Sequence, residues 1–147
     1  MIIILGADHN GFESKNSILS HLLKRGYKIV DVSDNLQPGD DYPLIAQKVV
    51  NELKQNSDAK AILICGSGQG MVMAANRFNG VRAGLGWSRE AAKSIRNDEN
   101  ANLIAVPALL YTKDSKLGNQ IIDDFLSTPY ANAPRYNRRI IELDNLN

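Results

Sequence analysis

Hydrophobic residues along the chain follow two alternating patterns. Continuous apolar runs of four to six residues are typical of parallel strands buried on both faces. They predict five strands, at Ile2–Leu5, Tyr27–Val32, Ala61–Cys65, Val81–Leu85 and Leu103–Val106. Between these runs, apolar residues recur at helical spacing. They predict helices over Phe12–Leu23, Tyr42–Leu53, Met71–Phe78, Arg89–Arg96 and Leu117–Leu126, and a last helix, Arg135–Leu143, follows Pro134.

This alternation of strand and helix predicts the fold class. Right-handed crossovers between parallel strands place helices on both faces of the sheet. We therefore expect an α/β, three-layer Rossmann-like domain with a five-stranded parallel sheet and a C-terminal helix. The length of 147 residues, 44% of them hydrophobic, fits one domain spanning residues 1–147.

Composition narrows the function classes. A formal net charge of +1 provides no overall field to recruit nucleic acid or an anionic membrane. No apolar run approaches the ~20 residues of a membrane span, and the short run after Met1 does not resemble a signal peptide. We expect a cytoplasmic protein. One cysteine and two histidines argue against disulfides and metal sites, so no metal or cofactor is expected.

Polar residues follow the ends of several predicted strands, where ligands of such sheets bind. The most distinctive stretch is Cys65–Gly70, CGSGQG, in which glycines alternate after a strand. Such a loop lets backbone N–H groups point at an anion, with a helix N-terminus behind them. Met71 stands where three familiar loops need another residue. A phosphate-binding P-loop needs a lysine, a dinucleotide fingerprint needs its third glycine, and a cysteine phosphatase needs an arginine.

The lone thiol of Cys65 has two interpretations. Near backbone amides and a helix N-terminus, its pKa is expected to fall, which would make it a usable base or nucleophile. Free cysteine is also among the most often buried residues, so Cys65 could be a small core side chain.

Five motifs in order resemble the ribose-5-phosphate isomerase B and galactose-6-phosphate isomerase family. They are GADHNGF with Lys15, DYP at 41–43, CGSGQG at 65–70, AANRF at 74–78 and GVRA at 80–83. The resemblance implies a metal-free aldose–ketose isomerase acting on a phosphosugar. It also implies a homodimer or homotetramer whose active sites are shared across the dimer interface.

The resemblance assigns roles to individual residues. Cys65 would take the proton from C2 of the opened sugar, while Gly66, Ser67, Gly68, Gln69 and Gly70 hold the enediolate oxygens. Asp8 and His9 match the pair that contacts sugar and phosphate, and Tyr42 matches an aromatic residue lining the site. Each has a structural alternative: Ser67 and Asp8 as helix caps, and Tyr42 as ordinary packing.

The C-terminal run resembles the phosphate clamp of the family. Arg135 and Arg139 stand at i,i+4 spacing, which places both guanidinium groups on one helix face. In the family this helix serves the site of the neighbouring subunit. The alternative is a solvated basic face.

Three positions depart from the family pattern. Asp98 stands where the ring-opening histidine is usual, Glu99 replaces an asparagine, and Leu109 replaces a phosphate-binding arginine. A carboxyl group can open a hemiacetal if its surroundings raise its pKa, so Asp98 is a candidate ring-opening residue and Glu99 a candidate substrate contact. The alternative for Asp98 is a residue that ends a helix.

Three functions therefore remain open. The favoured one is isomerisation of ribose 5-phosphate to ribulose 5-phosphate through a cis-enediolate. The second is isomerisation of another phosphosugar, such as galactose or allose 6-phosphate. The third is a non-catalytic partner subunit, against which the complete glycine loop and Cys65 argue.

Overall fold

The computed structural model describes residues 1–146; Asn147, the last residue of the predicted domain 1–147, lies outside the described residues. Within residues 1–146 the strands are β1 (Ile2–Ala7), β2 (Lys28–Asp31), β3 (Lys60–Cys65), β4 (Ala83–Leu85) and β5 (Leu103–Pro107). The helices are α1 (Phe12–Lys24), α2 (Tyr42–Gln55), α3 (Gln69–Ala75), α4 (Arg89–Asn97), α5 (Ala108–Lys113), α6 (Ser115–Ser127) and α7 (Pro134–Asp144).

All five strands pair in parallel in the order β2-β1-β3-β5-β4. Each strand is short, apolar and followed by a helix that returns the chain to the opposite edge of the sheet, as right-handed crossovers require. The predicted fold class, an α/β Rossmann-like fold with a C-terminal helix, is confirmed.

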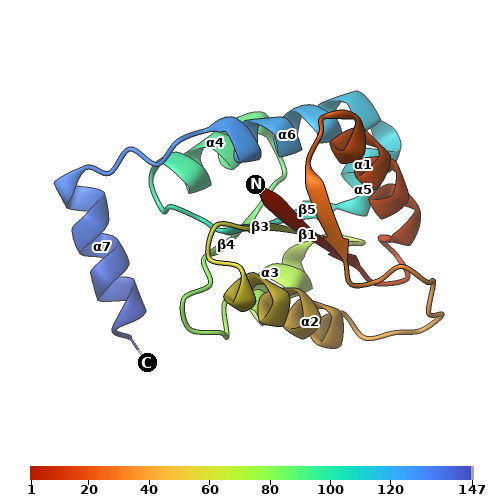
Figure 1. Ribbon diagram of the computed structural model, residues 1–147, viewed down its shortest axis with the longest axis horizontal. Helices are drawn as coiled ribbons and strands as arrows, with labels where there is room; N and C mark the ends of the chain where they lie inside the picture. The colour runs from red at the N-terminus through yellow and green to blue at the C-terminus, as the bar shows by residue number, and fades with distance from the viewer. Residues whose placement is uncertain (147) are drawn as a thin grey trace.

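The sheet separates two hydrophobic clusters, because successive strand residues point to opposite faces. On one face, Ile62 and Ile64 pack with α1, α4, α5 and α6; on the other, Leu63 and Cys65 pack with α2 and α3. Figure 1 shows the three layers, with α7 standing apart from both helix layers beyond α4 and β4. The core thus fixes the carboxyl ends of the strands on one edge of the sheet.

Two helices differ from the sequence prediction. Helix α3 ends at Ala75 instead of Phe78, because the Asn76 amide turns to pair with the backbone of Ala83 at 2.8 and 2.9 Å, just where β4 begins. Helix α5 was not predicted. It forms because Ala108 and Tyr111 are buried against the core, although six residues are too few for a clear helical pattern.

A buried lysine ties α1 to the neighbouring strand. The Lys15 side chain is fully buried; its Nζ pairs with the Asp31 carboxylate and donates to the carbonyl of Ser33 at 2.8 Å. A buried charge needs such a partner. This pair fixes α1 against β2, and it accounts for Lys15 without any contact to a ligand.

No helix in the described part of the chain, residues 1–146, is both long and apolar enough to cross a membrane.

Candidate functional site

Cys65 closes β3 at the carboxyl edge of the sheet, where the chain turns into the glycine loop. Its neighbour across the sheet is Asp8, whose backbone N–H donates to the carbonyl of Ile64 at 3.3 Å. Both side chains are about 95% buried, with exposed fractions of 6% and 5%. The ends of the adjacent strands β1 and β3 therefore bring a carboxyl group close to the thiol.

The glycine loop wraps its amides around the Cys65 sulfur. The N–H of Gly68 donates to Sγ at 3.1 Å, and the amides of Ser67 and Met71 also act to lower the thiol pKa. Burial nevertheless raises the pKa of Cys65, and the charge of Asp8 adds to this, so the pKa lies above its ordinary value. The expectation of a lowered pKa was wrong, because a strand-end pattern does not reveal how deeply the sulfur is buried.

The glycines are required by close packing as well as by the turn. Gly68 adopts a left-handed conformation, with φ of 77°, at the start of α3. A Cβ on Gly70 would come within 2.8 Å of the Tyr42 ring, so this ring lies directly against the loop. Ser67 accepts a long hydrogen bond of 3.4 Å from the N–H of Gln69, but the N-cap of α3 is Gly68, so the alternative of Ser67 as a helix cap was wrong.

His9 and Asp8 follow β1 and point in different directions. Asp8 accepts hydrogen bonds from the N–H groups of Asn10 and Gly11, both at 3.0 Å, so it organises the turn before α1. Burial raises the pKa of Asp8 despite these bonds. The exposed His9 instead contacts Asp40, whose Oδ1 lies 3.0 Å from Nδ1; this hydrogen bond raises the pKa of His9.

A cavity of about 640 Å³ opens beside the glycine loop. Gly66 and Ser67 form one wall, and α5 forms another through Leu109 and Lys113. The volume is within the range of small-molecule sites. Leu109 therefore lies beside the loop, and it makes this wall apolar. It stands at the position where the family that the sequence resembles commonly has an arginine.

Asp98 and Glu99 lie at the other edge of the sheet. Helix α4 runs back from the end of β4, and Asp98 caps its C-terminus before β5 begins. Along β5, the start of the strand pairs with Ala61, whereas its end, Pro107, pairs with Cys65. At ~3.3 Å per residue, these two ends are roughly 13 Å apart. Asp98 and Cys65 of one chain therefore do not share a site.

The surroundings of Asp98 keep its carboxyl group ionised. Asn97 donates to Oδ1 at 2.7 Å and Ser94 to Oδ2 at 3.4 Å. The hydrogen bond from Asn97 lowers the pKa of Asp98 most, and Tyr136 and Arg135 of α7 contribute. The hypothesis that its surroundings raise this pKa was wrong. Asp98 is suited to accept a proton, and it also ends α4, as the structural alternative stated.

Helix α7 brings the predicted phosphate clamp to this second edge. The N–H of Ala131 donates to the carbonyl of Asn97 at 3.1 Å, which ties the segment before α7 to the end of α4. Arg135 lies over the Tyr136 ring, 4.6 Å from its centroid, and donates to the Tyr136 hydroxyl at 2.7 Å. Arg135 and Arg139 are both exposed, one turn apart.

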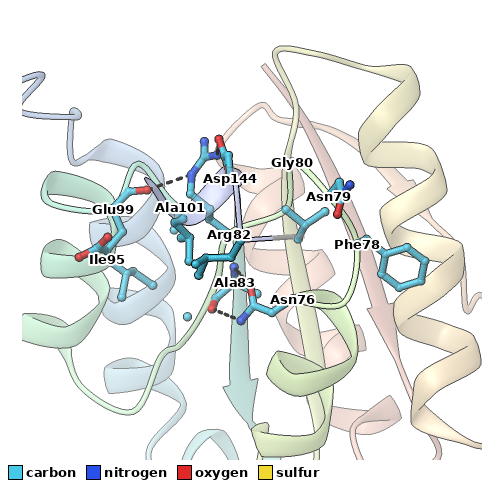
Figure 2. A pocket seen from close by; sticks show the side chains of 14 residues that line it. Asn76, Phe78, Asn79, Gly80, Arg82, Ala83, Ile95, Glu99, Ala101 and Asp144 are labelled. Atoms are coloured by element: carbon cyan, nitrogen blue, oxygen red, sulfur yellow. Dashed lines mark hydrogen bonds and ion pairs between the residues drawn. The ribbon is translucent and has the colours of Figure 1, made fainter. Parts of the chain in front are cut away.

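A second cavity, of about 410 Å³, lies between the end of α7 and the loop preceding β4. Figure 2 shows Arg82 at its centre, with its guanidinium beside Asp144 and bonded to the carbonyl of Glu99. Glu99 thus lines this cavity and not the one beside the glycine loop.

The predicted site residues therefore form two groups in one chain. The carboxyl-edge group contains Asp8, His9, Tyr42, Cys65 and the loop from Gly66 to Gly70. The amino-edge group contains Asp98, Glu99, Arg135 and Arg139. Sequence reasoning missed Asp40 and Tyr136, which contact members of the two groups, because nothing in the sequence shows which residues their side chains meet in space. Residues 1–146 contain no cluster of three His, Cys, Asp or Glu side chains able to hold a metal ion.

Sequence comparison places this geometry in a family. The pattern of the Ribose/Galactose Isomerase family matches residues 3–143. The chain belongs to this family. Among its relatives, ribose-5-phosphate isomerase B of Mycolicibacterium paratuberculosis is 37% identical over 141 residues, which are 95% of this chain and 87% of that protein.

Solved structures of family members share the whole fold. A ribose 5-phosphate isomerase from Thermotoga maritima is 36% identical, with a TM-score of 0.93 over 99% of this chain and 98% of the other. The Mycoplasma genitalium ribose-5-phosphate isomerase B, solved with bound ribulose 5-phosphate, is 34% identical, with a TM-score of 0.89 over 97% and 93% of the two chains. The isomerase family is thus supported by sequence and by fold.

Proposed function

We propose that this chain interconverts ribose 5-phosphate and ribulose 5-phosphate, with Cys65 as the base. The observation that carries the proposal is the environment of the thiol. It stands at a strand end, surrounded by loop amides and adjacent to Asp8, in a member of a sugar isomerase family. The structural similarity to a protein that holds ribulose 5-phosphate supports a five-carbon substrate.

The chemistry requires one proton to move between neighbouring carbons. The Cys65 thiolate removes the proton from C2 of the open aldose, and the electron pair forms the C1–C2 double bond of a cis-enediolate. The proton then returns from the thiol to C1, while a proton passes from the oxygen on C2 to the oxygen on C1, which leaves the ketose. The amides of the glycine loop are placed to stabilise the negative oxygens.

The raised pKa of Cys65 affects this step in two ways. A thiol with a higher pKa is a stronger base once it is ionised, but a smaller fraction is ionised at neutral pH. The amides of Ser67 and Gly68 compensate in part, because they lower the pKa that burial raises. No metal or cofactor is part of the proposal.

The complete site requires two copies of the chain. Ring opening and the phosphate clamp are assigned to Asp98, Arg135 and Arg139. Asp98 lies at the opposite edge of the sheet from Cys65, and the segment before α7 is tied to that same edge. A homodimer with two sites would supply each Cys65 group with the amino-edge group of the second copy. Asp98, held as a carboxylate, would accept the proton of the anomeric hydroxyl as the bond between C1 and the ring oxygen breaks, and would return this proton to the ring oxygen.

The remaining contacts divide between sugar and phosphate. Asp8 and Tyr42, both beside the loop, are assigned to the sugar, with Glu99 of the second copy. His9, Arg135 and Arg139 are assigned to the phosphate, which guanidinium groups bind well. We expect this reaction to belong to pentose phosphate metabolism and to take place in the cytoplasm.

A second candidate is isomerisation of a six-carbon sugar phosphate. It is favoured by Leu109, which leaves the wall beside the loop without an arginine, and by the cavity of about 640 Å³ next to it. Galactose 6-phosphate and allose 6-phosphate are the substrates that would test this.

The experiment is ketose formation by purified protein. We expect turnover of ribose 5-phosphate that a chelator does not reduce, and loss of at least about a thousandfold in Cys65→Ala with substrate binding retained. Cys65→Ser, which replaces the thiol with a hydroxyl of similar shape, is the matched variant. Faster turnover of a hexose phosphate would favour the second candidate. Binding without turnover of any sugar would favour a non-catalytic subunit.

A further inference from the structure

A side-chain contact between His9 and Asp40 brings together two segments that are 31 positions apart. One carboxylate oxygen of Asp40, Oδ1, accepts from the His9 backbone N–H at 2.8 Å and lies 3.0 Å from Nδ1 of the ring. The Asp40 side chain is mostly buried, with 17% exposed, whereas that of His9 is 38% exposed. The contact therefore fixes the imidazole while leaving part of it open to a ligand.

The loop before α2 is shaped to hold Asp40 in this place. Gly39 adopts a left-handed conformation, with φ of 74°, and the N–H of Asp40 donates to the carbonyl of Gln37 at 3.2 Å. Because β2 and β1 are adjacent in the sheet, this loop lies beside the end of β1. The turn at Gly39 and the adjacency of β1 and β2 therefore place Asp40 next to His9.

The contact has a defined chemical consequence. A carboxylate on Nδ1 directs that nitrogen to carry a hydrogen and leaves Nε2 for the ligand. The charges of two acidic groups act on the ring, that of Asp40 in contact and that of the adjacent Asp8 from a distance, and both favour the protonated imidazole. When protonated, Nε2–H is a charged donor; when neutral with the hydrogen on Nδ1, Nε2 is an acceptor that repels phosphate oxygens.

A cation is needed here because of Leu109. Leu109 carries no charge, and the buried Lys15 is occupied by Asp31 and Ser33. Lys113, one turn after Leu109 on α5, also lines this cavity, and its contribution is tested below. Within the carboxyl-edge group itself, His9 is the side chain able to become positive.

We propose that Asp40 is a positioning residue for phosphate binding: by holding the His9 ring through Nδ1, it presents Nε2–H as a charged donor to the phosphate of the substrate. This inference rests on the proposed function, since it assumes a phosphorylated ligand at the carboxyl-edge group. On this inference, the His9 ring held by Asp40 supplies the positive charge that Leu109 does not carry.

The first experiment measures His9 without any sugar. The chain has two histidines, so NMR titration gives two ring signals, and His9→Gln identifies one of them. His21, paired with Asp123 at 3.0 Å, is the internal reference. Asp40→Asn keeps an oxygen acceptor but removes the charge. We expect the His9 titration to move to lower pH, because the charge of Asp40 favours the protonated ring. An unmoved His9 titration overturns the inference.

The second experiment measures anion binding with inorganic phosphate and with ribose 5-phosphate. In Asp40→Asn we expect the Kd for phosphate and the KM for the sugar to rise severalfold near pH 8, with kcat within about twofold. Below about pH 5.5 the Kd difference should vanish, because a histidine is then protonated with or without Asp40. Asp34→Asn removes a charge from the same loop without touching His9, and should change neither constant.

A gain-of-function variant completes the test. Leu109→Arg places a permanent cation on the α5 wall of the cavity beside the glycine loop, so it should restore phosphate affinity in Asp40→Asn at pH 8. A Kd that is equal in wild type and Asp40→Asn at that pH overturns the inference. If Lys113→Ala weakens phosphate binding and Asp40→Asn does not, Lys113 supplies the cation and Asp40 does not. Because phosphate binding is measured without turnover, failure of the isomerase proposal would be seen separately.

Discussion

Opposing electrostatic effects act on the Cys65 thiol, the residue on which the proposed chemistry depends. Burial and the charge of Asp8 disfavour the thiolate, whereas hydrogen bonds from Ser67, Gly68 and Met71 favour it, and burial is the largest effect. The net result is a pKa above the ordinary value. The loop amides thus make ionisation of a deeply buried sulfur less costly, without making the thiol acidic.

This balance predicts the pH dependence of the reaction. The base is the thiolate, whose population rises with pH, so kcat should increase by about tenfold per unit through the neutral range and level off above the raised pKa. Asp8→Asn can still accept hydrogen bonds from Asn10 and Gly11 but lacks the charge. It should therefore lower the pKa of Cys65.

Alkylation of the thiol measures that shift directly. The rate of reaction with iodoacetamide follows the thiolate fraction, and it should rise at lower pH in Asp8→Asn than in wild type. Bound phosphosugar should protect Cys65 in both. Equal alkylation profiles in the two proteins would show that Asp8 does not act on the sulfur.

At Asp98, in contrast to Cys65, hydrogen bonds outweigh burial in their effect on the pKa. It receives hydrogen bonds from Asn97 and Ser94, and its pKa is lowered. We expect Asp98→Asn to slow turnover of the cyclic sugar by about a hundredfold, since general base catalysis contributes roughly that much or more. Proton exchange at C2 of substrate supplied in the open form should change little.

Two measurements separate this role from helix capping. Thermal unfolding of Asp98→Asn reports any loss of the α4 cap, and Ser94→Ala removes only the weaker of the two bonds to the carboxylate. If Asp98→Asn isomerises the cyclic sugar at the native rate, Asp98 serves only to end α4, and ring opening passes to His9, Glu99 or solvent.

Helix α7 is the element whose position matters most to the proposal. It is attached to the rest of the chain by few contacts: the hydrogen bond from Ala131 to Asn97, the buried Tyr136 ring, and the pair of Arg82 with Asp144 at 3.6 Å. Figure 1 shows that it extends away from the helix layers. Its apolar Ile141 and Leu143 are exposed, at 61% and 46%. These features are those of a helix available to a second copy.

The arginines of α7 can be tested against each other. Arg135→Ala and Arg139→Ala should each raise KM about tenfold or more, because a charge-assisted hydrogen bond to phosphate contributes roughly 1.5–3 kcal/mol. The kcat should fall less, since the phosphate is bound equally in ground and transition states. Steady-state kinetics measure both.

Arg138→Ala is the matched control on the same helix. Its guanidinium pairs with Glu142 at 3.7 Å on an exposed face, an interaction worth well under ~1 kcal/mol. It should leave KM unchanged. An effect of Arg138→Ala as large as that of Arg139→Ala would indicate a general field of the helix and not a specific clamp.

At the scale of the whole molecule, the two groups of site residues lie on opposite edges of the sheet. A shared site predicts that defects in different groups complement each other. Cys65→Ala and the double variant Arg135→Ala, Arg139→Ala are each expected to be nearly inactive at substrate concentrations far below KM. Mixed after unfolding and refolding together, they should recover about one quarter of the wild-type activity, because half of the dimers contain one intact site.

The control for complementation uses two defects in one group. Cys65→Ala mixed with Cys65→Ser leaves every site without its thiol, so this mixture should recover nothing. If the first mixture also recovers nothing although dimers form, each chain holds its own site, and the assignment of α7 to the second copy is wrong.

The pattern of apolar residues was sufficient to predict the five strands, most helices and the loop that carries Cys65. These features depend on the local periodicity of apolar residues and on glycines at a turn. Both are determined by residues that are close together in the sequence. The strand boundaries differ from prediction by one or two residues, as at β2 and β4. The resemblance of five motifs to a family of isomerases is confirmed by the match over residues 3–143.

Only the tertiary structure decided the features that join distant parts of the chain. Helix α5 depends on Ala108 and Tyr111 finding a core to pack against. The pKa of Cys65 depends on burial and on Asp8, 57 positions earlier in the sequence. The separation of Asp98 from Cys65 follows from α4 running back across the sheet, and the pairing of His9 with Asp40 follows from the adjacency of β1 and β2. Electrostatic effects and shared sites depend on distance in space, which the order of residues alone does not specify.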